Sequence, residues 1–345
     1  MSVARKEVEI AGGGLAGLSL GVALRGRGVP VRVREAGVYP RHRVCGEFIS
    51  GVTDEELGGL GIADLLEDAE RHRSTVWFDE GGEVMRGELP SAARGVSRFC
   101  LDLRLVERLR ELGGMVETGA RVEGVAGGRE GLVLAVGRPR RESKWLGLKA
   151  HYSDLRLEAG LEVHVTGKGY VGLTGVEDGR VNVCGLFERG EALGAGGRGG
   201  AVVRAVREAG LGELAGRLEE AEVDERSVTG VKQFLLGWQP RAGVDELRLG
   251  DQAAMIPPFT GNGMSMAFQG ALDAVEPLVG WSEGRMGWRE AVSMVRKAHR
   301  RRFRARLRWS WLLHGLLLNG GTRQVCLGLV RQGWVPFEAI YRRVR

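Results

Sequence analysis

The chain of 345 residues has little of what a cross-linked, metal-bound or membrane-spanning protein needs. Its four cysteines, Cys45, Cys100, Cys184 and Cys326, form no Cys-x-x-Cys pair and no zinc-ligand spacing, so we expect neither a disulfide framework nor a metal site. No uncharged apolar stretch reaches the ~18 residues that a membrane-spanning helix requires. The first residues contain no apolar signal region, and the default expectation is therefore a cytoplasmic protein with free thiols.

Composition and charge indicate which class of protein this is and which partners it has. Hydrophobic residues make up 43% and charged residues 27% of the chain, as in ordinary globular proteins, and 345 residues exceed what one hydrophobic core usually holds. Positive charge gathers between Arg285 and Arg308. Because no nucleic-acid-binding signature accompanies it, we expect no nucleic-acid partner. The segment is either a solvated helix face or a basic helix in peripheral contact with an anionic membrane.

The first 35 residues have the pattern of a strand, a helix and a second strand. Val8 and Ile10 end a short apolar run, apolar residues from Leu15 to Leu24 recur with helical spacing, and residues 29–34 alternate. Such a βαβ unit favours a parallel sheet. Further helices are expected at 54–70, 101–112, 201–218, 263–278 and from 288 onward, a hairpin at 75–88, and strands at 132–136, 144–152, 161–165, 170–174, 180–187 and 247–249.

A glycine motif lies between the first strand and the first helix. Gly12, Gly14 and Gly17 match Gly-x-Gly-x-x-Gly at this junction. The first glycine permits the tight turn, the second lets the backbone approach a pyrophosphate, and the third lets helix and strand pack closely. Glu35 ends the second strand, where an acid can accept hydrogen bonds from a ribose 2′-hydroxyl. The sequence therefore predicts a dinucleotide bound at the start of the helix.

A second copy of the same spacing has no such setting. Gly194, Gly196 and Gly199 follow a polar loop and not a strand, and no βαβ unit surrounds them. We interpret this copy as a low-complexity loop, so the sequence predicts no separate nicotinamide-binding domain.

The segment 247–271 contains a second informative pattern. A predicted strand ends at Gly250-Asp251, a proline-rich turn follows, and Gly261-Asn262-Gly263 opens a helix. This segment resembles the Gly-Asp motif of the flavoprotein superfamily that includes geranylgeranyl reductases and aromatic-ring hydroxylases. The resemblance implies that Asp251 holds the ribityl hydroxyls of FAD and that 261–263 present backbone donors to the pyrimidine edge of the flavin. Residues 257–259 would form an apolar wall beside its reactive face.

Two more segments extend the resemblance. Residues 41–47 are similar to the basic-then-Cys-Gly element of geranylgeranyl reductases, where the cysteine lies near the flavin and a basic residue binds FAD, and Ser97-Arg98 resembles the arginine that precedes a helix in this superfamily. Cys45 is either an active thiol or a small buried hydrophobe. The catalytic positions implied are Cys45, Pro258 and Phe259. The FAD-binding positions are Gly12, Gly14, Leu15, Ala16, Gly17, Glu35, Ala36, Arg43, Cys45, Gly46, Arg98, Gly250, Asp251, Pro258, Gly261, Asn262, Gly263 and Met264.

The chain departs from the superfamily pattern at three places. Glu47 follows Gly46 where geranylgeranyl reductases have a second glycine. The hydroxylases have an Asp-Gly pair after the strand near Val136, whereas residues 137–141 contain no acid. Residues 238–240 do not form the Trp-x-Trp-x-Ile-Pro element of the halogenases in this superfamily, which argues against halogenation.

These patterns predict an α/β protein with a Rossmann-like FAD-binding domain, an inserted antiparallel-sheet substrate domain and a helical C-terminal tail. The FAD-binding domain would comprise residues 1–75, 89–143 and 230–285, the substrate domain 76–88 and 144–229, and the C-terminal helical region 286–345.

The expected function is that of an FAD-dependent oxidoreductase that acts on a hydrophobic small molecule, isoprenoid-like, polyketide-like or aromatic, with NADH or NADPH as reductant. The resemblance to geranylgeranyl reductases implies double-bond reduction or oxidation. The same patterns are compatible with a monooxygenase that hydroxylates an aromatic or polyketide substrate. The missing Asp-Gly pair keeps open a non-catalytic flavoprotein, and the basic, tryptophan-rich tail keeps open a membrane-surface adaptor.

Overall fold

A five-stranded parallel sheet forms the first half of the molecule. The computed structural model describes residues 4–122, 128–138, 142–189, 200–233, 237–238 and 242–344. The strand order in this sheet is β14-β7-β1-β2-β6, and every pairing in it is parallel, as the βαβ pattern predicted. Its strands are β1 (Val8–Ala11), β2 (Val31–Glu35), β6 (Met115–Thr118), β7 (Leu132–Leu134) and β14 (Leu247–Arg248).

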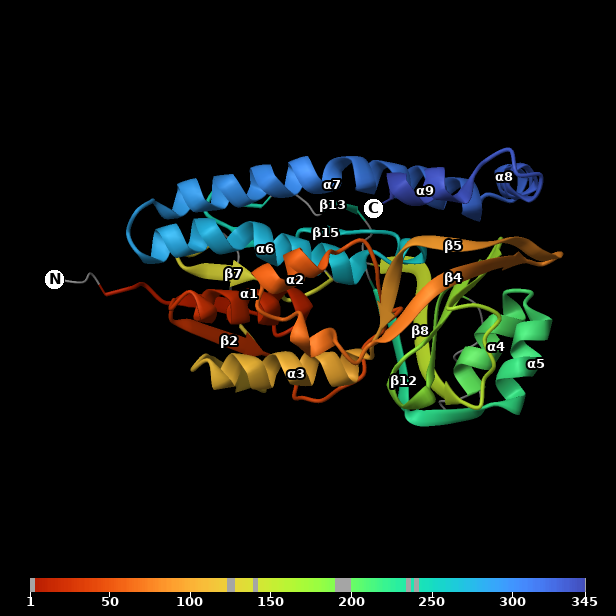
Figure 1. Ribbon diagram of the computed structural model, residues 1–345, viewed down its shortest axis with the longest axis horizontal. Coiled ribbons are helices and arrows are strands. Elements are labelled where there is room, and N and C mark those ends of the chain that lie inside the picture. Colours follow the sequence, from red (N-terminus) through yellow and green to blue (C-terminus); the bar gives the residue numbers. More distant parts are fainter. Residues whose placement is uncertain are drawn as a thin grey trace.

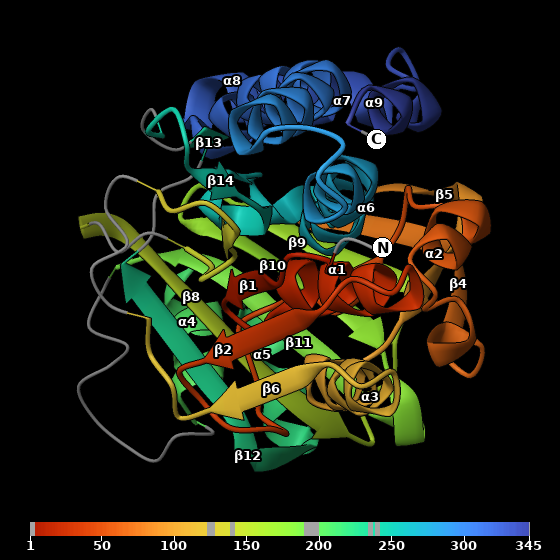
Figure 2. The same cartoon turned by 90° about the vertical axis from the view of Figure 1, so that its left-hand side faces the viewer.

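Three helices pack together beside this sheet (Figure 2). They are α1 (Leu15–Gly26), α3 (Arg98–Glu111) and α6 (Gly263–Ser282). Helix α1 lies between the other two and is buried from Leu15 to Leu24. A helix buried on all sides needs apolar or small residues around its whole circumference, and the composition of α1 provides them.

An eight-stranded sheet forms the second half, with the order β12-β8-β11-β10-β9-β4-β5-β3. All of its pairings are antiparallel except the one between β4 and β9. Its strands are β3 (Phe48–Ile49), β4 (Glu70–Asp79), β5 (Gly82–Gly95), β8 (Glu142–Ser153), β9 (Leu161–Thr166), β10 (Gly169–Gly175), β11 (Val181–Glu188) and β12 (Glu222–Gln233). The short strands β13 (Gly237–Trp238) and β15 (Ala254–Met255) pair separately.

The two faces of the large sheet have different chemistry. On β8, Leu148, Ala150 and Tyr152 belong to the apolar core under α4 and α5. Lys149 and His151 alternate with them and therefore lie on the opposite face. That face is the one that turns toward the parallel-sheet half, because Lys149 and His151 contact residue 47 there.

The helix expected at 201–218 is in fact two helices, α4 (Gly200–Glu208) and α5 (Gly212–Glu220). Gly210 has φ +90°, a left-handed conformation that ends a helix at little cost for glycine. The expected helix at 54–70 is also shorter, because α2 (Asp54–Gly59) ends before Gly61 at φ +71°. Its start is as predicted, with Thr53 and Glu56 forming a capping box.

The hairpin expected at 75–88 is longer than the pattern indicated, since β4 and β5 together span residues 70–95. Strands β6 and β12 were not predicted at all. Single turns of 3₁₀ helix lie at η1 (Asp64–Leu66), η2 (Glu177–Gly179), η3 (Gly250–Gln252) and η4 (Pro258–Thr260). The domain boundaries stay a prediction.

The C-terminal region is a third layer and not a loose tail. Helix α7 (Trp288–Leu318) runs along α6 and reaches the large sheet, where α8 (Gly320–Arg331) packs on β5 (Figure 1). Helix α9 (Phe337–Arg343) contacts both α7 and β5. One face of α7 is buried against α6, and the opposite face exposes most of the basic residues, whereas Arg306 is buried. No helix in the described ranges combines the length and apolar character needed to cross a bilayer. Peripheral membrane contact and a cytoplasmic location both stay predictions.

The backbone at Gly169 gives a test of the large sheet. Gly169 has φ +147°, and a Cβ there would lie 2.0 Å from the carbonyl oxygen of Leu186. We therefore expect Gly169→Ala to lower the free energy of unfolding by at least ~2 kcal/mol. Gly172→Ala in the same strand is the matched control, because its nearest neighbour would be 3.9 Å away. Urea denaturation of both variants measures the difference, and equal stabilities would contradict this account.

Candidate functional site

The glycine turn before α1 is shaped by close backbone approaches. A Cβ on Gly12, which has φ +107°, would lie 2.2 Å from the carbonyl oxygen of Ala135, and a Cβ on Gly17 would lie 2.1 Å from that of Gly12. Gly14 is the N-cap of α1 and contributes no side-chain cap. The first amides of α1 therefore have no intrahelical partner and face outward as donors. The structure thus gives both Gly12 and Gly17 the packing reason that the motif implied.

Glu35 lies beside this turn and is held by several donors. Its carboxylate accepts hydrogen bonds from the backbone amides of Gly13 and Gly37, each at 2.8 Å, and pairs with Arg41 at 2.6 Å. Burial alone would raise the pKa of Glu35, but the Gly37 amide and the guanidinium groups of Arg43 and Arg41 lower it below its usual value. The carboxylate is thus ionised and fixed next to the turn. Its neighbour Ala36, the other predicted ribose-side residue, is exposed.

Tyr39 is a part of this turn that the sequence did not reveal. Its hydroxyl donates to the carbonyl oxygen of Gly13 at 2.6 Å. A Cβ on Gly13 would lie 1.8 Å from that hydroxyl. A side chain at position 13, a variable position of the motif, would therefore displace the Tyr39 hydroxyl from this hydrogen bond.

Two arginines lie over the turn and share one buried carboxylate. Arg43 pairs with Asp102 at 2.9 Å, and Arg98 pairs with the same residue at 2.8 Å. Arg43 also donates to the carbonyl oxygen of Gly13 at 3.3 Å, and an Arg98 nitrogen lies 3.8 Å from the Cβ position of Gly14. The carboxylate of Asp102 has no exposed side-chain surface. With Arg41 and the ionised Glu35 included, three cations face two anions, because Arg43 also lies 3.5 Å from Glu35. This leaves a net positive charge beside the open amides of α1, which suits an anionic ligand.

The Gly-Asp segment meets this turn directly. The Cβ position of Gly250 lies 3.1 Å from the Cβ of Ala16 in the first turn of α1. Asp251 has no hydrogen bond to any described residue, and its charged neighbour is Arg138 at 3.8 Å. Burial raises the pKa of Asp251, and Arg138 and Arg98 oppose that effect. The two motifs, far apart in the sequence, are therefore neighbours, and the carboxylate between them is available to accept hydrogen bonds.

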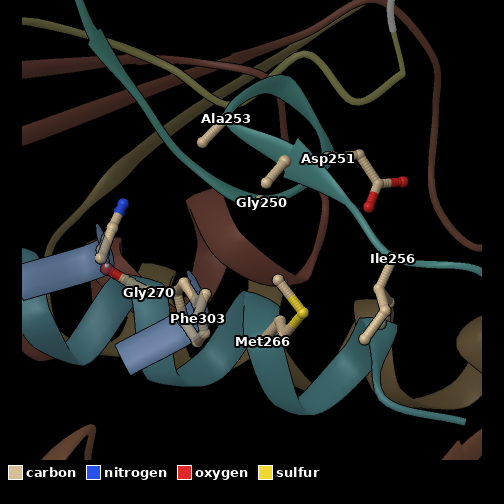
Figure 3. Close-up of a pocket in the computed structure, with 10 residues that line it drawn as sticks. Gly250, Asp251, Ala253, Ile256, Met266, Gly270 and Phe303 are labelled. Carbon is tan, nitrogen blue, oxygen red and sulfur yellow. Dashed lines mark hydrogen bonds between the residues drawn. The ribbon is translucent and has the colours of Figure 1, made fainter. Parts of the chain in front are cut away.

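A small cavity lies behind the Gly-Asp turn, between α6 and α7 (Figure 3). Its lining includes Gly250, Met266, His299 and Phe303, and its volume of about 10 Å³ is at the lower limit for one water molecule. The side chain of Asp251 points away from Phe303 in this view. The cavity, which Asp251 and Gly263 also line, is therefore too small for a substrate.

The glycine turn at 261–263 packs on the segment that follows Cys45. Gly261 has φ +64°, and its Cβ position lies 3.0 Å from the ring of Phe48. The hydroxyl of Ser265 donates to the carbonyl oxygen of Ser50, and Met264 is buried in the core. Asn262 is fully buried, and its side chain donates to the carbonyl oxygen of Val344. The C-terminal residues thus close over this turn, which the sequence did not predict.

Cys45 lies close to the predicted FAD-binding residues, with Gly46 exposed after it. Burial raises the pKa of the Cys45 thiol, and the positive charge of Arg98 offsets this only in part. The thiol is therefore protonated at neutral pH, which favours the hydrophobic role over the reactive thiolate. Pro258 and Phe259 form the 3₁₀ turn η4, which contacts β10 of the large sheet.

Glu47, noted in the sequence only as a departure from the family pattern, is the centre of a buried polar cluster. The residue has φ +53° and a fully buried side chain. Its carboxylate accepts from the backbone amide of Arg98 at 2.9 Å and lies 2.6 Å from Nε2 of His151 and 3.3 Å from Nζ of Lys149. Burial would raise the pKa of Glu47, but the hydrogen bond from His151 and the charge of Lys149 lower it overall.

His42 completes this cluster as a neutral acceptor. Its Nδ1 lies 3.2 Å from Nζ of Lys149. Burial and the charges of Lys149 and His151 lower the pKa of His42 to about 4. The ring is therefore uncharged at neutral pH, and its Nδ1 accepts a hydrogen bond from the ammonium group of Lys149. The cluster joins the segment 42–47 of one half to strand β8 of the other, and thereby fixes the Cys45-Gly46 turn against the large sheet.

The residues present fit an FAD. The open amides of α1, together with Arg43 and Arg98, would hold the pyrophosphate. Glu35 would accept hydrogen bonds from the adenosine ribose, and Asp251 would accept them from the ribityl hydroxyls. The position that lacks the Asp-Gly pair brings Arg138 to Asp251 instead, and Arg138 also donates to the carbonyl oxygen of Val44 at 3.0 Å. Residues 139–141, 239–240 and the second glycine motif at 194–199 lie outside the described ranges, so the predictions made for them stay untested.

No protein-family model matches the chain. A menaquinone reductase of Mycobacterium tuberculosis is 29% identical over 123 residues, a segment that covers 34% of this chain and only 30% of that protein. Among solved structures, PqsL of P. aeruginosa in complex with 2-aminobenzoylacetate superposes with a TM-score of 0.74 at 16% identity, over 94% of this chain and 98% of that one.

Two further structures agree over nearly the full length. HpxO of Klebsiella pneumoniae, complexed with FAD and uric acid, has a TM-score of 0.73 at 17% identity and covers 98% of this chain and 95% of its own. The p-nitrophenol 4-monooxygenase PnpA of Pseudomonas putida has a TM-score of 0.74 at 13% identity, and the match covers 98% of this chain and 97% of that one. This chain has the fold of the FAD-dependent monooxygenases. The predicted fold class is thereby confirmed, and identities this low show the fold alone.

The glycine turn offers a test of cofactor binding. We expect Gly17→Ala to weaken FAD binding at least tenfold, because its Cβ would collide with the carbonyl oxygen of Gly12 and displace the amides of α1. Gly26→Ala is the control, since a Cβ at that end of the same helix meets nothing within 4 Å. Flavin absorbance that remains after dialysis measures retention, and circular dichroism checks the fold. Equal retention by the two variants would remove the glycine turn from the site.

The buried Glu47 cluster offers a test by pH. A carboxylate whose pKa is lowered by folding stabilises the fold at every pH above its pKa in the unfolded chain, which is near 4.5. This contribution is lost as the pH falls through the lower pKa of the folded protein. We expect Glu47→Gln to cost about 3–5 kcal/mol at pH 7, the usual penalty for breaking a buried pair. The difference from the unsubstituted protein should shrink as the pH is lowered from 7 to below 4.5, the ordinary pKa of a glutamate.

Urea denaturation across this pH range measures both quantities. Glu338→Gln is the control, because its ion pair with Arg342 is exposed and should contribute little. A difference between Glu47→Gln and the unsubstituted protein that stays constant with pH would show that Glu47 is not ionised in the fold.

Proposed function

We propose that this chain is an FAD-dependent monooxygenase that hydroxylates a hydrophobic aromatic or polyketide-like molecule, with NADH or NADPH as the reductant. The observation that carries the proposal is the meeting of two distant motifs: Gly250 lies against Ala16, and Asp251 presents an acceptor with no hydrogen-bond partner in the described residues. The fold it shares with PnpA, PqsL and HpxO supports the reaction type.

The residues of the chain would hold and orient the cofactor. When bound, FAD would supply the electrons for oxygen insertion into the substrate. Arg43 and Arg98 would neutralise the pyrophosphate, and Asp102 would keep both guanidinium groups in place. The turn at 261–263 would direct backbone donors and the N-terminus of α6 toward the flavin edge, where negative charge gathers on reduction.

The substrate would lie between the flavin and the inner face of the large sheet. That face divides into a polar half around Lys149 and His151 and an apolar half around Tyr170 and Leu186. The apolar half continues into Phe259 of the 3₁₀ turn η4. A hydrophobic substrate therefore finds apolar surface next to the predicted catalytic wall of Pro258 and Phe259.

Reduction of a double bond in an isoprenoid-like molecule is the second candidate, and the partial match to a menaquinone reductase favours it. The resemblance of residues 41–47 to geranylgeranyl reductases points the same way. Both candidates share the FAD site and the nicotinamide reductant, and they differ in their need for oxygen.

The decisive experiment measures flavin reduction and reoxidation by stopped flow. We expect purified protein to be yellow, to be bleached by NADH or NADPH, and to consume oxygen with a gain of one oxygen atom in the product. Anaerobic turnover that saturates a carbon–carbon bond would replace hydroxylation with the reductase. A colourless protein that also fails to bind added FAD would overturn both candidates and leave a non-flavin function.

A further inference from the structure

Helix α7 brings a histidine into an aromatic cluster at the apolar half of the inner sheet face. The ring of His314 lies 6.2 Å from each of the rings of Trp145, Tyr170 and Phe259, measured between centroids. Trp311 lies 5.6 Å away on the same helix, and Tyr170 and Phe259 are 5.8 Å apart. The cluster therefore combines residues of β8, β10, η4 and α7, which lie far apart in the chain.

His314 is buried but not satisfied. Its Nδ1 has no exposed surface and no hydrogen-bond partner within the described residues. Other buried histidines use Nε2: His164 pairs with Glu162 at 2.7 Å, and His299 bonds the carbonyl oxygen of Gly270 at 3.0 Å. His151 also has an unpartnered Nδ1, but its Nε2 lies 2.6 Å from Glu47, whereas neither ring nitrogen of His314 has a hydrogen bond among the described residues. A buried polar atom left without a partner is costly, and such an atom in a native protein calls for an explanation.

The chemistry around His314 selects the kind of group that Nδ1 would meet. Burial and the charge of Lys144 lower the pKa of His314 to about 4, so the ring is neutral at pH 7, and Nδ1 is a donor or an acceptor depending on the tautomer. The ammonium group of Lys144 forms an ion pair with Glu188 at 3.2 Å and lies over the ring of Trp145. The cluster thus provides aromatic surface and two neutral polar groups, the Nδ1 of His314 and the hydroxyl of Tyr170. Among the described residues it provides no unpaired cation for a carboxylate.

We propose that His314 is a substrate-binding residue, and that its Nδ1 hydrogen-bonds the hydroxyl or carbonyl group of a planar, uncharged ring compound seated against Trp145, Tyr170 and Phe259. This inference rests on the proposed function, because Phe259 is the predicted wall beside the flavin. It assigns one wall of the substrate site to α7, for which the sequence left open a solvated helix face or a peripheral membrane contact.

The test compares two ring probes that differ in a single hydroxyl group, 1-naphthol and naphthalene. Naphthalene is the more apolar, so burial alone favours it, whereas a hydrogen bond to His314 favours 1-naphthol. Calorimetric titration of the full-length protein should show about tenfold tighter binding of 1-naphthol, a difference equal to about 1.4 kcal/mol. In His314→Leu this preference should fall to about one or below.

Two further variants secure the interpretation. His314→Asn keeps a hydrogen-bonding group near the position of Nδ1 and should retain part of the preference, even if His314→Leu fails to fold. His164→Gln removes a buried histidine from the opposite face of the sheet and should leave the preference unchanged. The inference is overturned if the unsubstituted protein binds neither probe, if it shows no preference, or if His314→Asn and His164→Gln behave alike.

The outcome is separable from that of the proposed function. FAD content and oxygen-dependent turnover are measured on the same preparations. A yellow, active protein that does not prefer 1-naphthol contradicts only the role of His314. A colourless protein that still distinguishes the two probes through His314 contradicts only the monooxygenase.

Discussion

The contact between the first turn of α1 and the Gly250-Asp251 turn is the constraint on which the site depends. It requires a glycine at position 17, because the helix must lie against the backbone of Gly12, and it requires the small Ala16 where Gly250 approaches. A larger side chain at any of these positions would separate the two turns. The anion-binding end of α1 and the carboxylate of Asp251 could then no longer face one ligand.

A second constraint joins the two halves of the molecule. Glu47 follows Arg43 by four residues in the segment that lies over the glycine turn. Its side chain is buried against Lys149 and His151 of the large sheet. Such a pair contributes less to stability than its short distances suggest, since both charges lose their hydration. Its consequence is positional: both halves of the molecule hold the Cys45-Gly46 turn, and this would fix the proposed flavin site relative to the large sheet.

The parts predicted from the sequence are those where local pattern and packing agree. The βαβ unit, the glycine turn and the capping box at Thr53 have short-range signals, and the structure contains all three. Strand β12 was missed because its polar, exposed residues lack clear alternation, and the break at Gly210 was missed because a single glycine does not show its φ in the sequence. Tyr39, Glu47 and His314 act through partners distant in the chain. Only the departure at Glu47 gave a local signal.

Gly137-Arg138 stand where the hydroxylases of this superfamily have an Asp-Gly pair. The loss of this pair does not by itself remove the proposed FAD site. Near that position Arg138 lies 3.8 Å from Asp251 and donates to Val44. An arginine at this position would donate hydrogen bonds to the pyrophosphate oxygens of FAD. An acid at the same position would instead accept a hydrogen bond from a hydroxyl group of the cofactor. The change therefore alters which atoms of the cofactor are recognised and need not abolish binding. For this reason the missing pair is weak evidence for a non-catalytic flavoprotein, and the open carboxylate of Asp251 is the stronger evidence for an intact site.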